Sequence, residues 1–235
     1  MLELLGLARG LLIRAFVLSQ IVILDQVASA MASGKLVPKE REWTVVITSF
    51  LLCTTALMAT CRAHKVNLGC ATGFLMQASA GALSAIHSYT AEPSALLTVS
   101  LRDVSWLSMV IGLPLVSFGF HWLNGDRLAA NSAAAVGILI AGCCGGLAEE
   151  GRETAVSLAI AAPVLSVLTV CLVTTNLYGI LGSLAVGLAG MAKEFRLGEQ
   201  LGLKEVVVRN VLLTCGVVAL HRALDTQQKQ QAETT

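Results

Sequence analysis

Long apolar blocks separated by very short polar joints constrain this chain more than any other feature of its sequence. A helix needs about 20 mostly apolar residues to cross a bilayer core about 30 Å thick. Blocks of about that length recur at 44–61, 68–89, 104–123, 128–148, 154–174, 177–192 and 205–223. The joints between them include RAHK at 62–65, NGDR at 124–127 and EEGRE at 149–153. Because joints this short make consecutive helices antiparallel, the sequence predicts an all-α, multi-pass transmembrane helical bundle of about seven or eight segments.

The composition supports lipid, rather than water, as the surroundings of these blocks. Hydrophobic residues make up 55% of the 235 residues and charged residues only 13%, whereas a soluble domain has about 25% charged residues. The formal net charge is +1, and no basic stripe interleaves with aromatic residues. Nucleic acid is therefore not an expected partner, and membrane lipids are.

The seven cysteines fit neither a metal site nor a disulfide framework. Nearly all lie inside apolar blocks, where cysteine behaves as a small buried hydrophobic residue. Their spacings match no zinc-binding pattern, and an odd number does not suggest a set of disulfides. We therefore expect no metal and no cofactor.

An N-terminal apolar segment at 1–40 has two interpretations. Arg9 and Arg14 precede the stretch AFVLSQIVIL, and ASA follows at 28–30, which is the layout of a secretory signal peptide. The same residues also fit a retained signal-anchor helix over about 11–31, which we favour slightly. We expect a protein of the endomembrane system.

The remaining chain divides into the helical bundle at 41–225 and a polar C-terminal tail at 226–235. The tail, TQQKQQAETT, contains no large apolar residue, and we predict that it is disordered.

Small residues recur at four-residue spacing in several blocks. Since lipid tails are as apolar as leucine, membrane helices associate where small residues let their backbones come close. We expect mainly internal packing, and the set formed by Gly179, Ser183 and Gly187 is also a candidate face for self-association or for another membrane protein. Pro114 and Pro163 lie inside apolar blocks and predict kinks there.

The joint at 124–127 has a structural interpretation. Asn124 and Gly125 tolerate the positive φ of a tight turn, and Asp126 occupies the N-cap position of the following helix. Trp122 suits the membrane interface. Arg127 can extend toward lipid headgroups, and it is our candidate for binding a phosphate.

The same region also has a catalytic interpretation, which we favour less than the structural one. His121 lies near Asp126, and the two could form a general-base pair. Asn131 could donate a hydrogen bond to a developing charge. However, no nucleophile motif is present, and Ser117 and Ser132, the nearest serines, lie in ordinary helical context.

Three further polar residues fall in or beside apolar blocks: Asp25, Gln77 and Arg209. A pairing of Asp25 in the first segment with Arg209 in the last would close the bundle. An ionisable or polar side chain at membrane depth is a functional candidate by default. Gln77 is a candidate ligand-binding residue, although an amide at this depth more often bridges two helices. Arg209 lies near the start of the last block, where extension toward the headgroups explains it more simply.

Three stretches resemble the transmembrane protein 276 family of vertebrates: VIGLPLVSFGFHWLNGDRLAAN at 110–131, TTNLYGILGSLAVGLAG at 174–190 and HRALDTQ at 221–227. The likeness extends over roughly 42–227. It implies a multi-pass membrane protein, and it assigns a functional role to no residue.

Two functional hypotheses follow. The first is a non-enzymatic membrane protein that acts as a scaffold, a partner subunit or a passage for small molecules. The alternative is an intramembrane lipid-modifying enzyme that uses His121 and Asp126.

Overall fold

Every element that the structure describes is helical, as the sequence predicts. The structure, a computed structural model, describes residues 43–90, 92–144 and 149–234. The elements are α2 (Trp43–Ala63), α3 (Leu68–Tyr89), α4 (Ala95–Leu107), the π-helical turn η1 (Ser108–Gly112), α5 (Leu113–Leu123), α6 (Arg127–Cys144), α7 (Glu149–Val173), α8 (Leu177–Gly190), α9 (Leu197–Leu201) and α10 (Glu205–Thr234). The N-terminal segment at 1–40 lies outside the described residues.

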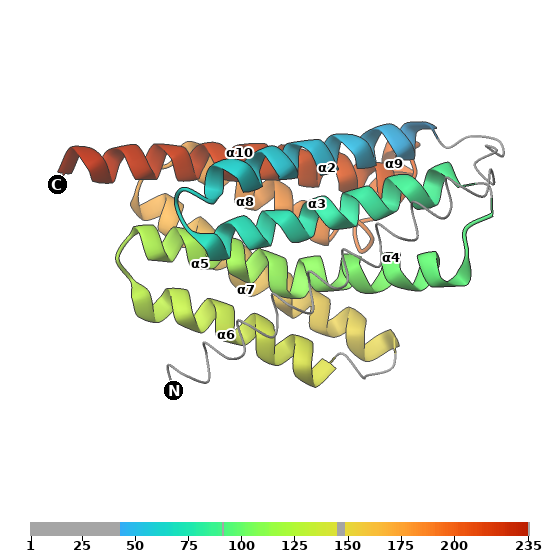
Figure 1. Cartoon of the computed structure of the whole chain (residues 1–235), viewed down its shortest axis with the longest axis horizontal. Coiled ribbons are helices and arrows are strands. Elements are labelled where there is room, and N and C mark those ends of the chain that lie inside the picture. Colours follow the sequence, from blue (N-terminus) through green and yellow to red (C-terminus); the bar gives the residue numbers. More distant parts are fainter. Residues whose placement is uncertain (1–42, 91, 145–148, 235) are drawn as a thin grey trace.

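The long helices lie side by side along one axis, and consecutive helices run antiparallel (Figure 1). Helices α2 and α10 lie along one edge of the bundle and α6 along the other, with α3 and α5 between them. Four helices in the described ranges are long and apolar enough to cross a membrane: Trp43–Ala63, Ala95–Leu123, Arg127–Cys144 and Glu205–Gln231. Two shorter apolar helices accompany them, Ser157–Val173 and Leu177–Gly190.

Two predicted boundaries were wrong because charged residues, taken as the ends of apolar blocks, lie inside helices. The segment expected to begin at 104 begins at Ala95, where the Ser94 hydroxyl accepts a hydrogen bond from the N–H of Leu97 at 3.2 Å. The joint expected at 149–153 is instead the first part of α7. Glutamate and arginine are good helix formers, so a charged stretch does not by itself end a helix.

The prediction of a disordered tail at 226–235 was also wrong, because α10 continues to Thr234. Gln227 is 3% exposed, and its side-chain Nε2 donates to Oγ1 of Thr174 at 3.3 Å. This contact continues the packing of α10 past the apolar block. Beyond it, glutamine, lysine and alanine favour a helix once it has begun.

A π-helical turn, η1, lies directly before Pro114, where the sequence predicts a kink. Proline lacks the N–H that an α-helix needs at this position, and π turns accommodate such disruptions. Helices α4 and α5 nevertheless form one continuous helical rod over Ala95–Leu123.

Glycines let α3 come close to its neighbours. A Cβ added at Gly73 would lie 2.5 Å from the carbonyl oxygen of Gly112 in η1, and one added at Gly81 would lie 3.0 Å from the carbonyl oxygen of Ser49 in α2. Backbone contact of this kind gains dispersion energy where lipid competes equally for apolar side chains. Of the 22 residues of α3, 12 are buried.

The small residues of α8 face the protein's own helices. A Cβ at Gly179 would collide with Cys171 of α7, and one at Gly187 would contact Val164 of α7. Ser183 is 1% exposed. Within the fold, this set of small residues is therefore used for internal packing.

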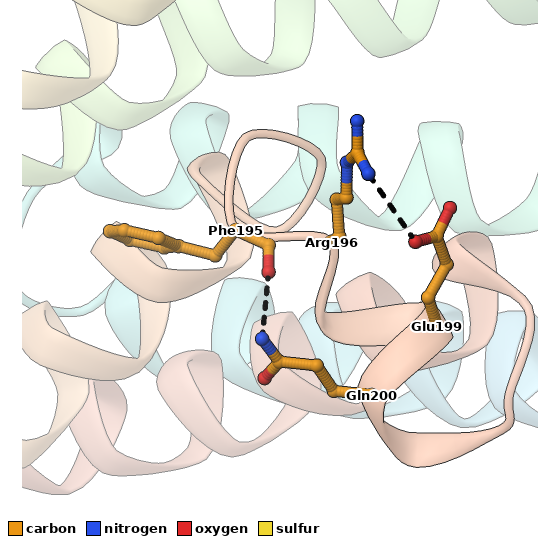
Figure 2. A network of polar contacts seen from close by, with 4 residues as sticks. All are labelled: Phe195, Arg196, Glu199 and Gln200. Carbon is orange, nitrogen blue, oxygen red and sulfur yellow. Dashed lines mark hydrogen bonds and ion pairs between the residues drawn. The ribbon is translucent and has the colours of Figure 1, made fainter.

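Helix α9 lies in the connection between α8 and α10. Figure 2 shows its polar contacts: Nε2 of Gln200 donates to the carbonyl oxygen of Phe195 at 3.4 Å, and Arg196 lies 3.9 Å from the carboxylate of Glu199. Both charged side chains are exposed, so this ion pair contributes little stability.

Candidate functional site

The joint at 124–127 forms the turn and helix cap that the sequence predicts. Gly125 has a φ of +78°, and Oδ1 of Asp126 accepts a hydrogen bond from the N–H of Ala129 at 2.9 Å. Nδ2 of Asn124 donates to the carbonyl oxygen of Phe120 at 2.8 Å. The carboxylate of Asp126 thereby accepts a hydrogen bond from one of the N–H groups that the first turn of α6 leaves without a helical partner.

Aromatic and cationic groups lie together beside this turn. The guanidinium of Arg127 lies over the Trp122 ring, 5.4 Å from its centroid, and Trp122 stacks on Phe118 with centroids 5.4 Å apart. A half-exposed tryptophan with a cation over its ring is typical of a membrane interface. Asn131 is exposed on α6.

The catalytic candidate His121 lies against a serine that the sequence reasoning missed. Its Nε2 is 2.5 Å from Oγ of Ser166 in α7, while Asp126 is used as the helix cap. Thr169, in the same helix, donates instead to the carbonyl oxygen four residues back, as helical hydroxyls commonly do. Ser166 is 45 residues from His121 and belongs to no local motif, so only the fold brings the two together.

Ser166 also lines a groove between α6 and α7, with a volume of about 260 Å³. The lining is mostly apolar and includes Ala129, Ser132, Val136, Ile140, Ala159 and Ser166. Ser132 and Val136 are exposed, so the groove opens to the surroundings of the protein. Because α6 and α7 are antiparallel, Ser132 and Ser166 lie at the same end of the groove, and Ile140 and Ala159 at the other.

A second set of polar residues lies deeper in the bundle. Nε2 of the candidate Gln77 donates to the carbonyl oxygen of Ser108 in η1 at 3.0 Å, so this amide bridges α3 and the π turn. Nearby, Nδ2 of Asn210 donates to Oγ of Ser49 at 2.8 Å, and the hydroxyls of Ser49 and Ser84 are 2.9 Å apart. Ser49, Ser84 and Asn210 lie in three different blocks, and their meeting could not be predicted from spacing.

In the parts of the chain that the structure describes, no three His, Cys, Asp or Glu side chains gather closely enough to hold a metal ion. The structure instead has a groove, a histidine–serine pair at one end of it, and a buried polar cluster.

Comparison with known proteins identifies the family to which the chain belongs. No protein-family model matches the chain, and no solved structure matches it. It is 32% identical over 189 residues to "Transmembrane protein 276" of Homo sapiens, covering 80% of this chain and 95% of that protein. The protein of the same name from Bos taurus is 34% identical over 191 residues, with the same coverage. Together with the apolar helices, these relatives identify the chain as a multi-pass membrane protein of the transmembrane protein 276 family.

Proposed function

We propose that this protein binds a single lipid acyl chain in the groove between α6 and α7, without converting it chemically. The observation that carries the proposal is the groove itself, which is apolar, open and about 260 Å³ in volume. That volume is slightly below the range of sites for drug-sized ligands, about 300–1,000 Å³. The mostly apolar lining suits an acyl chain rather than a polar headgroup.

The length of the groove supports the same occupant. Its lining on α6 extends from Ala129 to Ile140, which is about 16 Å at a rise of 1.5 Å per residue. Half of a bilayer core is about 15 Å thick. The groove therefore matches the depth of one leaflet.

Polarity along the groove also suits a lipid. Its His121–Ser166 end lies beside the turn with Trp122 and Arg127, two residues typical of the interface. The other end, at Ile140 and Ala159, is apolar. A chain entering from the interface would place its ester or carboxyl group near the polar end.

The proposed topology has seven crossing segments, formed by α2, α3, the α4–α5 rod, α6, α7, α8 and α10. Their antiparallel order and short connections support it. In this topology, the turns at 64–67, 124–126 and 174–176 lie on one membrane face.

Native mass spectrometry of the full chain, released from lipid nanodiscs, tests the proposal. Val136 lines the groove, whereas Leu139 is on the same helix, is 63% exposed and does not line it. Val136→Trp should reduce the fraction of protein carrying one lipid at least threefold, and Leu139→Trp should leave it unchanged. Equal lipid retention in both variants would refute the groove as the binding site.

A lipid-modifying enzyme remains a second candidate, and the Ser166–His121 hydrogen bond at the groove is the observation that favours it. A serine held by a histidine is the arrangement that activates a nucleophile. However, Ser166 lies inside α7, where backbone N–H groups are already used and cannot stabilise an oxyanion. Labelling of Ser166 by a fluorophosphonate, lost in both Ser166→Ala and His121→Ala but retained in Ser132→Ala, would establish the enzyme. Absence of labelling leaves the binding function.

A further inference from the structure

A small cavity, separate from the groove, lies where α2, α3, α4, η1 and α10 meet. Its volume is about 20 Å³, and Gln77, Ser84, Ser108, Arg209 and Asn210 are among the residues that line it. A cavity needs about 10–15 Å³ to hold one water molecule. The space is therefore large enough for one small molecule and too small for two.

Two polar atoms of residues at this cavity are buried and have no hydrogen-bond partner among the described residues. One is Oε1 of Gln77, whose side chain is 2% exposed, and the other is Nε of Arg209. Leaving a buried polar group unpaired costs about 1–3 kcal/mol, and more for a charged group. Both belong to residues that line the same cavity.

The orientation of the Gln77 amide is fixed by its other contact. Only the nitrogen can donate to the carbonyl oxygen of Ser108 at 3.0 Å, so Oε1 is the atom left to accept a hydrogen bond. The residues that line the cavity thus offer one free acceptor, Oε1 of Gln77, and one free donor, Nε–H of Arg209.

We propose that this cavity binds one water molecule, which accepts a hydrogen bond from Nε–H of Arg209 and donates one to Oε1 of Gln77. The two unpaired atoms select this ligand. An anion would meet the partial negative charge of the Gln77 oxygen, and a metal cation would meet the Arg209 guanidinium. Water serves as acceptor and donor at once, and Ser84 and Asn210 provide further polar neighbours.

The bound water would connect the π turn η1 to helix α10. Gln77 already holds the carbonyl oxygen of Ser108 in the π turn, and the water extends this link to Arg209 of α10. It would thereby fix the α4–α5 rod to α10 and explain how an arginine is tolerated at this depth.

Magnetisation transfer from water to side-chain amides, measured by NMR on the isotope-labelled full chain in lipid nanodiscs, tests the proposal. Transfer to the Nε2 protons of Gln77 is expected, although this side chain is buried. The variant with a filled cavity, Ala80→Val, supplies the control. No transfer to Gln77 in the unmodified protein would overturn the proposal.

Two variants add a second readout. Ala80 lines the cavity and Ala82 does not. Ala80→Val should abolish the transfer to Gln77 by filling the space, while Ala82→Val should preserve it. Persistence of the signal in a folded Ala80→Val protein would place the water elsewhere and contradict the site.

Discussion

Replacing Gly73 with alanine should separate α3 from the π turn. The new Cβ would lie 2.5 Å from the carbonyl oxygen of Gly112 and 2.9 Å from Cγ2 of Val116, almost an ångström closer than an ordinary contact in the first case. The obstacle is backbone, which cannot rotate away. Overpacking of this kind costs about 1–3 kcal/mol. Separating α3 from the π turn would also lengthen the 3.0 Å hydrogen bond from Nε2 of Gln77 to the carbonyl oxygen of Ser108. A hydrogen bond of this kind contributes about 1 kcal/mol to stability.

Alanine also gains about 1 kcal/mol over glycine in a helix interior, so the net loss at Gly73 should be about 1–3 kcal/mol. Gly142 in α6 is the control, because a Cβ there meets nothing within 4 Å. Gly142→Ala should therefore stabilise the protein by up to about 1 kcal/mol. Unfolding by a denaturing detergent in mixed micelles, followed by tryptophan fluorescence, measures both. Stabilisation of similar size in the two variants would refute the close packing of α3 on the π turn.

Three further predictions rest on other parts of the fold. Asp126→Ala should lower stability by about 0.5–2 kcal/mol through loss of the α6 cap, whereas Asp126→Asn should retain most of it; thermal unfolding compares them, and equal losses would contradict the capping role. Thr175 has a φ of 50°, which is unfavourable for a β-branched residue, so Thr175→Gly should raise the melting temperature; an unchanged or lower value would argue against the strained turn. Cys61 and Cys143 are exposed near opposite ends of the bundle, so an impermeant maleimide should label only one of them in sealed, uniformly oriented vesicles carrying single-cysteine variants; labelling of both from one side would contradict the proposed topology.

The helices could be predicted from the sequence because the length of the apolar blocks and the short joints between them are local properties. The same holds for the cap at Asp126 and the turn at Gly125, whose residue types dictate the backbone geometry. The ends of helices were harder to predict where residues outside the apolar blocks belong to the helix. Helix α10 continues past its apolar block, partly because Gln227 packs against Thr174, a contact between segments far apart in the chain.

The candidate site was predictable only in part, because its partners come from distant segments. His121 stood out as a histidine at a helix end, but its hydrogen-bond partner Ser166 looks like any other helical serine. Gln77 stood out as a central amide, yet the carbonyl oxygen that it binds belongs to a π turn that composition does not reveal. Pairings between antiparallel helices depend on their rotation and relative shift, which periodicity alone leaves open.

The most direct test of the groove as a lipid site is a cross-linking map. Membranes containing the full chain would be supplied with phospholipids carrying a photoactivatable acyl chain, and the modified peptides would be identified by mass spectrometry. Cross-links concentrated on residues 129–140 and 159–166, which include the groove lining on α6 and α7, are expected. Their density should be several times that found on lipid-exposed positions such as Leu51 of α2. An even distribution over all exposed helices would contradict a specific acyl-chain site between α6 and α7.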